Sequence, residues 1–200
     1  GLGDFGKPEG FLDRQVPRWL SELESYAKFD NYPGPDVGDV DAVAAWLREH
    51  QPRSFSPGIM HGDYHAANVM FSPTGPDVVA IVDWEMCTIG DPLLDLGWML
   101  VCWPIEPDPL GSAGHLAELG GLASRGELLA AYLGAGGQPT AHLDWYLALA
   151  CLKLGVVIEG TWARYLAGRA TREAGERLHE SAVTLMGLGS AVAAGDNPFR

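Results

Sequence analysis

Three polar residues near the middle of the chain, Asp63, Asn68 and Asp83, have side chains that could carry out phosphoryl transfer. That reaction needs a group that orients the attacking hydroxyl and takes its proton, and a metal ion in fixed geometry that neutralises the phosphates. Magnesium prefers hard oxygen ligands, typically one or two protein groups together with phosphate oxygens and water. A carboxylate for the hydroxyl, with an amide and a second carboxylate for the metal, would supply these parts.

The spacing of the three residues fits this chemistry. Asn68 follows Asp63 by five positions, which is the spacing in the protein-kinase catalytic loop H-R-D-x-x-x-x-N. We expect Asp63 on a loop between two short strands, Asn68 where that loop returns to a strand, and Asp83 at the end of the next strand. Asp83 alone could simply cap a strand, but the two upstream residues favour a metal-binding role.

The elements that must position these residues are predicted from hydrophobic periodicity. Predicted helices before the motif cover residues 11–29 and 39–50. Predicted strands cover residues 58–60, 69–71 and 78–82. From Asp91 onward the pattern is helical to the end of the chain, with long helices over about residues 142–166 and 171–194. The sequence therefore predicts an α+β fold, mostly helical, with a small β insert that carries the catalytic loop.

Two helix starts carry capping signals. Asp91 is a candidate N-cap, with Pro92 at the first helical position. Ser124 and Glu127 form a capping box ahead of an apolar run.

Composition and charge exclude several classes of partner. The 200 residues suit one domain, and a net charge of -13 without a dense basic run excludes a nucleic acid bound through its phosphates. No apolar run approaches about 18 residues, so we expect no membrane partner; the most apolar stretch, residues 147–158, is predicted to be a buried helix. The three cysteines form no C-x-x-C pair, which argues against a zinc or redox site and favours reduced thiols in a cytoplasmic protein.

Three blocks of sequence carry a resemblance to a known family. The chain contains H-G-D-x-x-x-x-N at residues 61–68, I-V-D-W at 81–84 and G-D-P-x-x-D-L at 90–96. In this order the blocks resemble the aminoglycoside phosphotransferase family, which has a choline/aminoglycoside kinase-like fold. The helix with Arg14-Gln15-Val16-Pro17-Arg18-Trp19 and the Asp83-Trp84-Glu85 variant are similar to a branch that is fused to, or encoded beside, acyl-CoA dehydrogenases.

The resemblance implies a role for each residue of the motif. Asp63 would be the catalytic base, and Asn68 and Asp83 would hold Mg²⁺. ATP would be the co-substrate, and a hydroxyl of a small molecule would be the acceptor.

Further residues are assigned to supporting roles by the same resemblance. His61 would brace the loop, Asp95 would accept backbone hydrogen bonds from it, and Asp91 would cap the helix that follows. In this fold the late helices surround the acceptor. The candidate acceptor contacts are His65, Glu85, Trp145, Glu159, Trp162 and Arg164.

The acceptor itself is expected to be a hydroxylated acyl compound or another small metabolite rather than an aminoglycoside. The similarity to the acyl-CoA dehydrogenase branch is one reason. The other is charge, because the late helices interleave acids with arginines and would give a polycation little electrostatic attraction.

One part of the family's fold is missing from the sequence. Its N-terminal lobe has a β-sheet, a phosphate-covering loop and a lysine that binds the nucleotide. No run of strands precedes Ile59, and none of Lys7, Lys28 and Lys153 fits that role. We therefore expect residues 1–200 to form the C-terminal lobe, with the N-terminal nucleotide lobe of the same protein absent from this chain.

Two other functions remain open. A non-catalytic pseudokinase or scaffold lobe would explain the missing nucleotide-binding lysine, but it has no reason to keep Asp63, Asn68 and Asp83. A metallophosphoesterase is the other alternative, because residues 62–65 match its opening G-D-x-H. That chemistry uses two metals about 4 Å apart and needs further His and Asn ligands, whereas the chain contains no G-N-H motif.

Overall fold

The structure is a computed structural model that describes residues 5–110 and 121–199. Its helices are α1 (Gln15–Ser25), α2 (Val40–Glu49), α3 (Leu93–Val101), α5 (Arg125–Gly134), α6 (Leu143–Leu166) and α7 (Arg172–Ala193). Its strands are β1 (Gly58–Met60), β2 (Val69–Phe71), β3 (Val78–Ile81) and β4 (Thr88–Gly90). Short 3-10 helices cover Leu12–Arg14, Tyr26–Lys28, Ala66–Asn68 and Trp84–Met86. The prediction of a mostly helical α+β fold is confirmed.

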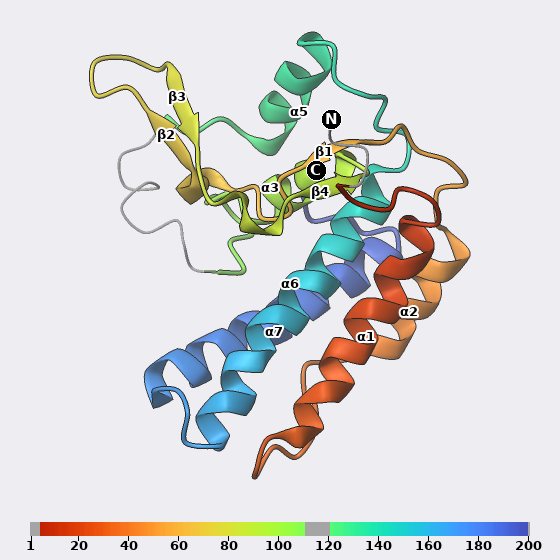
Figure 1. Ribbon diagram of the computed structural model, residues 1–200, viewed down its shortest axis with the longest axis vertical. Coiled ribbons are helices and arrows are strands. Elements are labelled where there is room, and N and C mark those ends of the chain that lie inside the picture. The colour runs from red at the N-terminus through yellow and green to blue at the C-terminus, as the bar shows by residue number, and fades with distance from the viewer. Residues whose placement is uncertain (1–4, 111–120, 200) are drawn as a thin grey trace.

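α6 is the centre of the helical body. It packs against α7, α3, α1 and α2, and α1, α2, α6 and α7 lie side by side at one end of the molecule (Figure 1). Leu147, Leu149 and Leu152 of α6 are buried in the core with Leu47 of α2 and Leu185 of α7. By length and composition alone α6 could cross a membrane, but 72% of its most apolar window is buried inside the protein. It is the core helix that the apolar pattern predicted.

Two small antiparallel sheets lie at the other end of the helical body. β1 pairs with β4, with Gly58 opposite Gly90, and β2 pairs with β3, with Val69 opposite Ile81. The β2–β3 hairpin projects away from the helices (Figure 1). Since β1 and β2 belong to different sheets, the segment between them is anchored at both ends by separate strand pairs.

The predicted element boundaries need three corrections. Residues 11–29 are not one helix, because 3-10 turns flank α1 on both sides. β4 was not predicted; its three residues are a strand only because β1 pairs with them. The predicted continuous helical region after Asp91 stops at Val101, and residues 103–110 form bends and turns. Three prolines at 104, 107 and 109 remove the N–H groups that a helix would need there. The part of that prediction over residues 111–120 lies outside the described residues.

Candidate active site

Residues 61–68 form a tight loop between the two sheets. Gly62 has φ of +88°, and a Cβ at this position would lie 2.5 Å from the backbone carbonyl oxygen of Met86. Any other residue would be strained by the positive φ and would clash with that carbonyl, so the position requires glycine. The close approach holds the loop against the chain that follows β3.

Asp95, in the first turn of α3, holds the start of this loop. Its carboxylate oxygens accept hydrogen bonds from the backbone N–H of His61 at 2.6 Å and of Gly62 at 2.9 Å. Burial raises the pKa of Asp95, and the two hydrogen bonds oppose that shift because they favour the ionised form. Asp95 therefore fixes two consecutive peptide groups just before Asp63.

His61 braces the loop from the side of β3. Its Nε2 lies 2.8 Å from the carbonyl oxygen of Val82, and its Nδ1 lies 3.3 Å from the backbone nitrogen of Asp63. Since a carbonyl only accepts and an N–H only donates, these contacts assign the proton to Nε2. The ring also contacts Trp84, with 4.7 Å between ring centroids. His61 thus links the backbone of Asp63 to the residue that precedes Asp83.

The Asp63 carboxylate has partners on both oxygens. Oδ1 accepts a hydrogen bond from Trp98 Nε1 at 3.1 Å, and Oδ2 accepts one from Asn68 Nδ2 at 3.3 Å. Oδ2 also lies 3.4 Å from His65 Nε2. Hydrogen bonding to His65 lowers the pKa of Asp63 despite partial burial, and Lys153 and Trp98 act in the same direction. The group is therefore a fixed carboxylate that is ionised at neutral pH and can accept a proton.

Asn68 is oriented by the loop that it closes. Its Nδ2 donates to the backbone carbonyl oxygen of Asp63 at 2.9 Å, in addition to the carboxylate bond. Both bonds use the amide nitrogen, and among the described residues no donor contacts the amide oxygen. A neutral, hard oxygen is left for a cation.

Asp83 lies two residues after the end of β3 and has an unusual backbone conformation. Its φ of 65° and ψ of 56° lie in the left-handed region, which is uncommon for a residue other than glycine and costs about 1 kcal/mol or more. The backbone N–H of Val82 donates to the carbonyl oxygen of Asn68 at 3.0 Å, so Asp83 comes directly after the residue that makes this contact. The side chain is exposed and has no hydrogen bond or ion pair within the described part of the chain.

The side chains of Asn68 and Asp83 are of the kinds that magnesium binds. One amide oxygen and one carboxylate are hard ligands, and magnesium usually takes its other ligands from phosphate and water. Within residues 5–110 and 121–199, no group of three or more His, Cys, Asp or Glu could hold a metal ion. The protein ligands of a two-metal phosphoesterase are thus not found in these ranges, and that alternative gains no support.

Asp91 is a buried structural residue at the start of α3. Its Oδ1 accepts a hydrogen bond from the backbone N–H of Leu93 at 3.1 Å, and its Oδ2 accepts one from the Tyr146 hydroxyl at 2.7 Å. The helix begins at Leu93 with Pro92 at the cap position, one residue later than predicted. Asp91 still satisfies the first helical N–H, and it ties α3 to α6.

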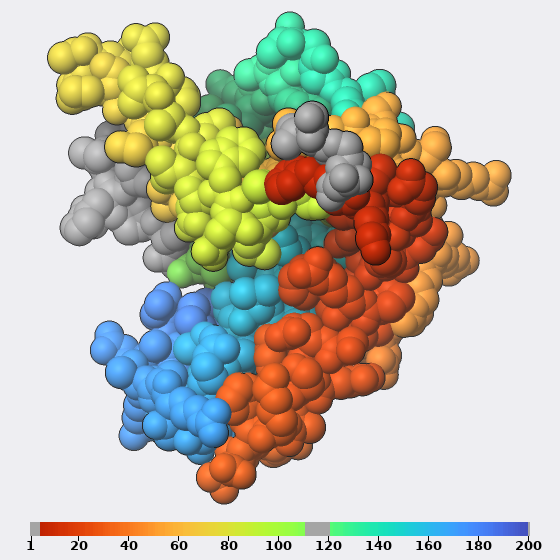
Figure 2. Space-filling view, viewed as in Figure 1, coloured from red at the N-terminus to blue at the C-terminus, as the bar shows by residue number. Residues whose placement is uncertain are grey.

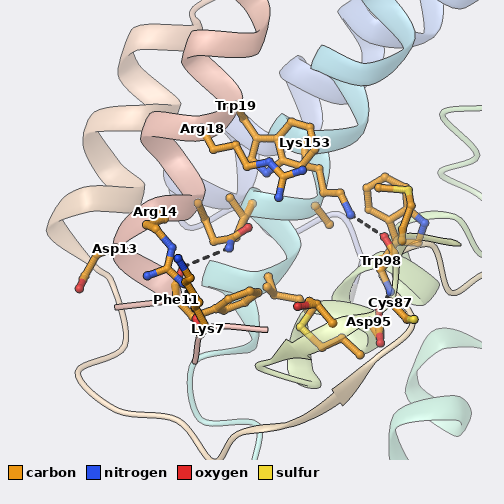
Figure 3. A pocket seen from close by; sticks show the side chains of 18 of the residues that line it. Lys7, Phe11, Asp13, Arg14, Arg18, Trp19, Cys87, Asp95, Trp98 and Lys153 are labelled. Atoms are coloured by element: carbon orange, nitrogen blue, oxygen red, sulfur yellow. Dashed lines mark hydrogen bonds between the residues drawn. The ribbon is translucent and has the colours of Figure 1, made fainter. Parts of the chain in front are cut away.

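A cavity of about 910 Å³ lies beside the loop, between α1, α3 and α6 (Figure 3). Gly62 and Trp98 form part of its wall, whereas Asp63 does not line it. Its charged lining residues are Lys7, Asp13, Arg14, Arg18, Glu85, Asp95 and Lys153. The chain has 13 basic and 26 acidic residues, and four of the basic residues but only three of the acidic residues line this cavity. The cavity is therefore much more basic than the chain as a whole.

Two of the predicted acceptor contacts are core residues instead. Trp145 is 1% exposed, and its Nε1 donates to the carbonyl oxygen of Leu47 at 2.8 Å. Glu159 is 0% exposed; its carboxylate accepts from the Tyr32 hydroxyl at 2.9 Å and lies 2.7 Å from His179 Nδ1. The apolar helix buries both side chains, so neither is available to an acceptor.

The remaining predicted contacts fall into two groups. Trp162 stacks on His179 with 5.0 Å between centroids, and Arg164 donates to Thr161 Oγ1 at 2.9 Å. Neither lines the cavity. Glu85 does line it, and His65 contacts the Asp63 carboxylate.

Sequence reasoning missed Trp98 and Lys153. Lys153 Nζ donates to the carbonyl oxygen of Gly62 at 2.6 Å and lies 4.1 Å from the centroid of the Trp98 ring. The sequence held one signal, since Lys153 is the single charged residue in the most apolar stretch of the chain, and a buried ammonium must find a partner. Its partner lies 91 residues earlier, which spacing along a helix cannot indicate.

Comparisons with known proteins give relatives of two kinds. The chain is 31% identical over 180 residues to acyl-CoA dehydrogenase family member 11 of Gallus gallus, and 29% identical over 177 residues to that of Homo sapiens. Each alignment covers 86% of this chain but 22% of the relative, so the chain spans about a fifth of their length. The predicted association with acyl-CoA dehydrogenases is confirmed by these names.

A solved structure and a family model also match. The crystal structure of a "putative aminoglycoside phosphotransferase" from Ralstonia eutropha superposes with a TM-score of 0.72 at 28% identity, covering 94% of this chain and 58% of that one. The model of the phosphotransferase enzyme family matches residues 1–148, a range that includes the loop, Asp83 and α3. The chain belongs to the phosphotransferase enzyme family.

Proposed function

We propose that this chain is the catalytic lobe of an ATP-dependent kinase that phosphorylates a hydroxyl of a small molecule. Asp63 is the base, and Asn68 and Asp83 hold magnesium. Bound magnesium would neutralise the phosphate charge. The observation that carries the proposal is the Asp63 carboxylate, which contacts Asn68 and is fixed by Trp98.

The proposed reaction is a single phosphoryl transfer. The acceptor oxygen forms a bond to the γ-phosphorus, and its proton passes to the Asp63 carboxylate. The bond between the γ-phosphorus and the bridging oxygen breaks, and ADP leaves with that electron pair. Because little covalent chemistry falls to the protein, positioning of the hydroxyl is the main contribution of the loop.

A second lobe of the same protein is proposed to cover the nucleotide. Exposed apolar side chains near the loop support this, because large apolar patches mark interaction sites. They are Ile59, Met70, Phe71, Val78 and Val79, each more than half exposed. The hairpin that carries four of them stands out from the body of the protein (Figure 2). The incomplete coverage of the solved phosphotransferase, 58% of its chain, is in keeping with a further lobe.

The acceptor is proposed to be a hydroxylated acyl compound or a similar small metabolite. The names of the relatives support this choice, and so does the charge of the cavity beside the loop. Arg14, Arg18 and Lys153 line that cavity, and a polycationic aminoglycoside would be repelled by them.

Transfer of label from γ-labelled ATP by the protein encoded by the full gene tests the proposal. We expect label in a hydroxy acid or its coenzyme A thioester and none in a kanamycin-type aminoglycoside. The isolated 200-residue chain should transfer little, because the proposed second lobe that covers the phosphates would be missing from the assay. Labelling of the aminoglycoside alone would overturn the acceptor class. Failure to label any hydroxyl compound, together with no binding of magnesium, would favour the scaffold alternative.

A further inference from the structure

The described part of the chain contains one charged side chain from α6 that reaches the loop, Lys153. We propose that Lys153 is a positioning residue for the catalytic base, and that its ammonium group fixes the Gly62–Asp63 peptide, while Asp95 holds the two peptide groups before it. This inference rests on the proposed function, since it assumes that Asp63 is the base.

The geometry of Gly62 carries the first step. Its N–H donates to Asp95 at 2.9 Å, and its carbonyl oxygen accepts from Lys153 Nζ at 2.6 Å. The two partners come from different helices, α3 and α6. A residue whose N–H and C=O are both held in this way, and whose φ of +88° is already set by the approach to Met86, has one orientation. The orientation of Gly62 in turn sets the position of the backbone of Asp63, the next residue.

The second step concerns the Asp63 side chain. Trp98 donates its indole N–H to Asp63 Oδ1 at 3.1 Å, and the Lys153 ammonium lies over the same indole, 4.1 Å from its centroid. An ammonium above an indole face is attracted by the ring and holds it in place. Lys153 therefore contacts both the backbone and the aromatic ring that set the position of the base.

The carboxylates near Lys153 give a reason for an amine rather than an apolar side chain at this buried position. Desolvation of an ammonium is costly unless opposite charges compensate it. The groups facing the amine are Asp95 from α3, Cys102 directly after α3, Asp63 from the loop and Arg18 from α1. Burial lowers the pKa of Lys153 to about 8, with Asp95 and Asp63 opposing the shift. At neutral pH the amine is mostly protonated, and it balances two carboxylates on the loop side.

If Lys153 had only a structural role, its loss would affect stability alone. The side chain would contribute to the stability of α6, but it would not alter the rate of phosphoryl transfer relative to substrate binding. A positioning residue changes kcat, because a displacement of the base by about 1 Å can cost about 100-fold in rate.

The test compares Lys153→Met, Lys153→Arg and the control Lys28→Met in the full-length protein. Lys28 flanks α1 and contacts Phe29, far in sequence from the loop. We expect Lys153→Met to lower kcat about 10–100-fold with little change in the KM for ATP, and Lys28→Met to leave both unchanged. The wild-type kcat should fall as pH rises through about 8, because the amine loses its proton there. That alkaline limb should be absent from Lys153→Met, and Lys153→Arg should recover part of the rate with the limb moved to higher pH.

Hydrogen exchange provides a readout that does not need activity. In Lys153→Met, amides of residues 58–68 should exchange faster while those of α7 are unchanged. If the wild type transfers no phosphate, the proposed function fails, and this exchange experiment alone decides the positioning role. Equal kcat in Lys153→Met and Lys28→Met, an alkaline limb that survives the loss of the amine, or unchanged exchange in the loop would overturn the inference.

Discussion

Asp63 and Asp83 are both carboxylates of the candidate site, but their surroundings differ. Asp63 has hydrogen bonds on both oxygens, which fix its orientation, and a lowered pKa, which keeps it ionised. Asp83 is exposed, with a left-handed backbone. A strained residue with a free carboxylate is suited to a ligand that the protein alone does not supply.

Substitution of Asp83 tests this assignment. Asp83→Asn removes the charge but keeps the shape, so magnesium should bind less tightly. We expect the magnesium concentration for half-maximal rate to rise by about 10–100-fold, the range seen when partners of a metal site are removed. The control is Asp77→Asn, an exposed residue of the hairpin turn, which should leave the magnesium requirement unchanged. An unaltered requirement in Asp83→Asn would remove Asp83 from the metal site.

Much of the candidate site could be predicted from the sequence. Asp63 and Asn68 follow from a local motif, and the family resemblance implied the bracing role of Asp95, which does accept the two backbone hydrogen bonds expected of it. Trp98 and Lys153 could not be predicted in this way. Their roles depend on how α3 and α6 pack against the loop, which no local pattern specifies.

At the scale of elements, the contact between α3 and α6 positions the site. α3 carries both Asp95 and Trp98, and α6 carries Lys153. The two helices approach each other closely at Gly97, because a Cβ there would be 2.9 Å from the carbonyl oxygen of Tyr146. The lack of a side chain at this position sets the distance between the helices.

Gly97→Ala should therefore destabilise the protein. An added methyl group would push α3 away from α6, and overpacking of this kind costs about 1–3 kcal/mol. The matched control is Gly187→Ala in α7, where a Cβ would meet nothing within 4 Å. Alanine should stabilise that helix by about 0.5–1 kcal/mol. Urea denaturation of both variants measures the two effects, and equal stability of Gly97→Ala and wild type would contradict the tight approach.

Local signals predicted most helix starts and the strands β1, β2 and β3, but not β4. Ser124 and Glu127 form the capping box expected of them, and the Asp39 side chain caps α2 by accepting from the N–H of Ala42. In each motif the interacting residues lie within four positions of each other in the sequence. β4 is defined by its pairing with β1, a contact about 30 residues away in sequence, so periodicity could not identify it.

At the scale of the whole molecule, Glu159 joins three distant segments of the chain. Its carboxylate in α6 contacts Tyr32, which follows α1, and His179 of α7. Glu159 was predicted to contact the acceptor, but its partners belong to the protein itself. Partners from 127 residues earlier and 20 residues later become visible only when the helices are assembled.

Glu159 should make stability depend on pH. Burial raises the pKa of Glu159 above its ordinary value of 4.5, and hydrogen bonds from His179 and Tyr32 oppose that shift. A raised folded-state pKa means that the protonated form favours folding. The contribution is fully present below about pH 4.5 and is lost as pH rises through the folded-state value.

Urea denaturation of wild type and Glu159→Gln between pH 4 and pH 8 measures this contribution. The stability of wild type relative to Glu159→Gln should fall with rising pH. The control Glu173→Gln, an exposed residue at the start of α7, should show no such trend. A constant difference between wild type and Glu159→Gln across the range would mean that burial does not raise the pKa of Glu159.

The role of Asp63 is the central claim, and the Asp63→Asn variant of the full-length protein tests it most directly. The amide keeps the size of the side chain but cannot take the hydroxyl proton. We expect a fall in kcat of about 10²–10⁴-fold, with the Kd of a fluorescent ATP analogue within a few-fold of wild type and Asp77→Asn fully active. A kcat for Asp63→Asn equal to that of Asp77→Asn, measured with the same acceptor, would contradict it.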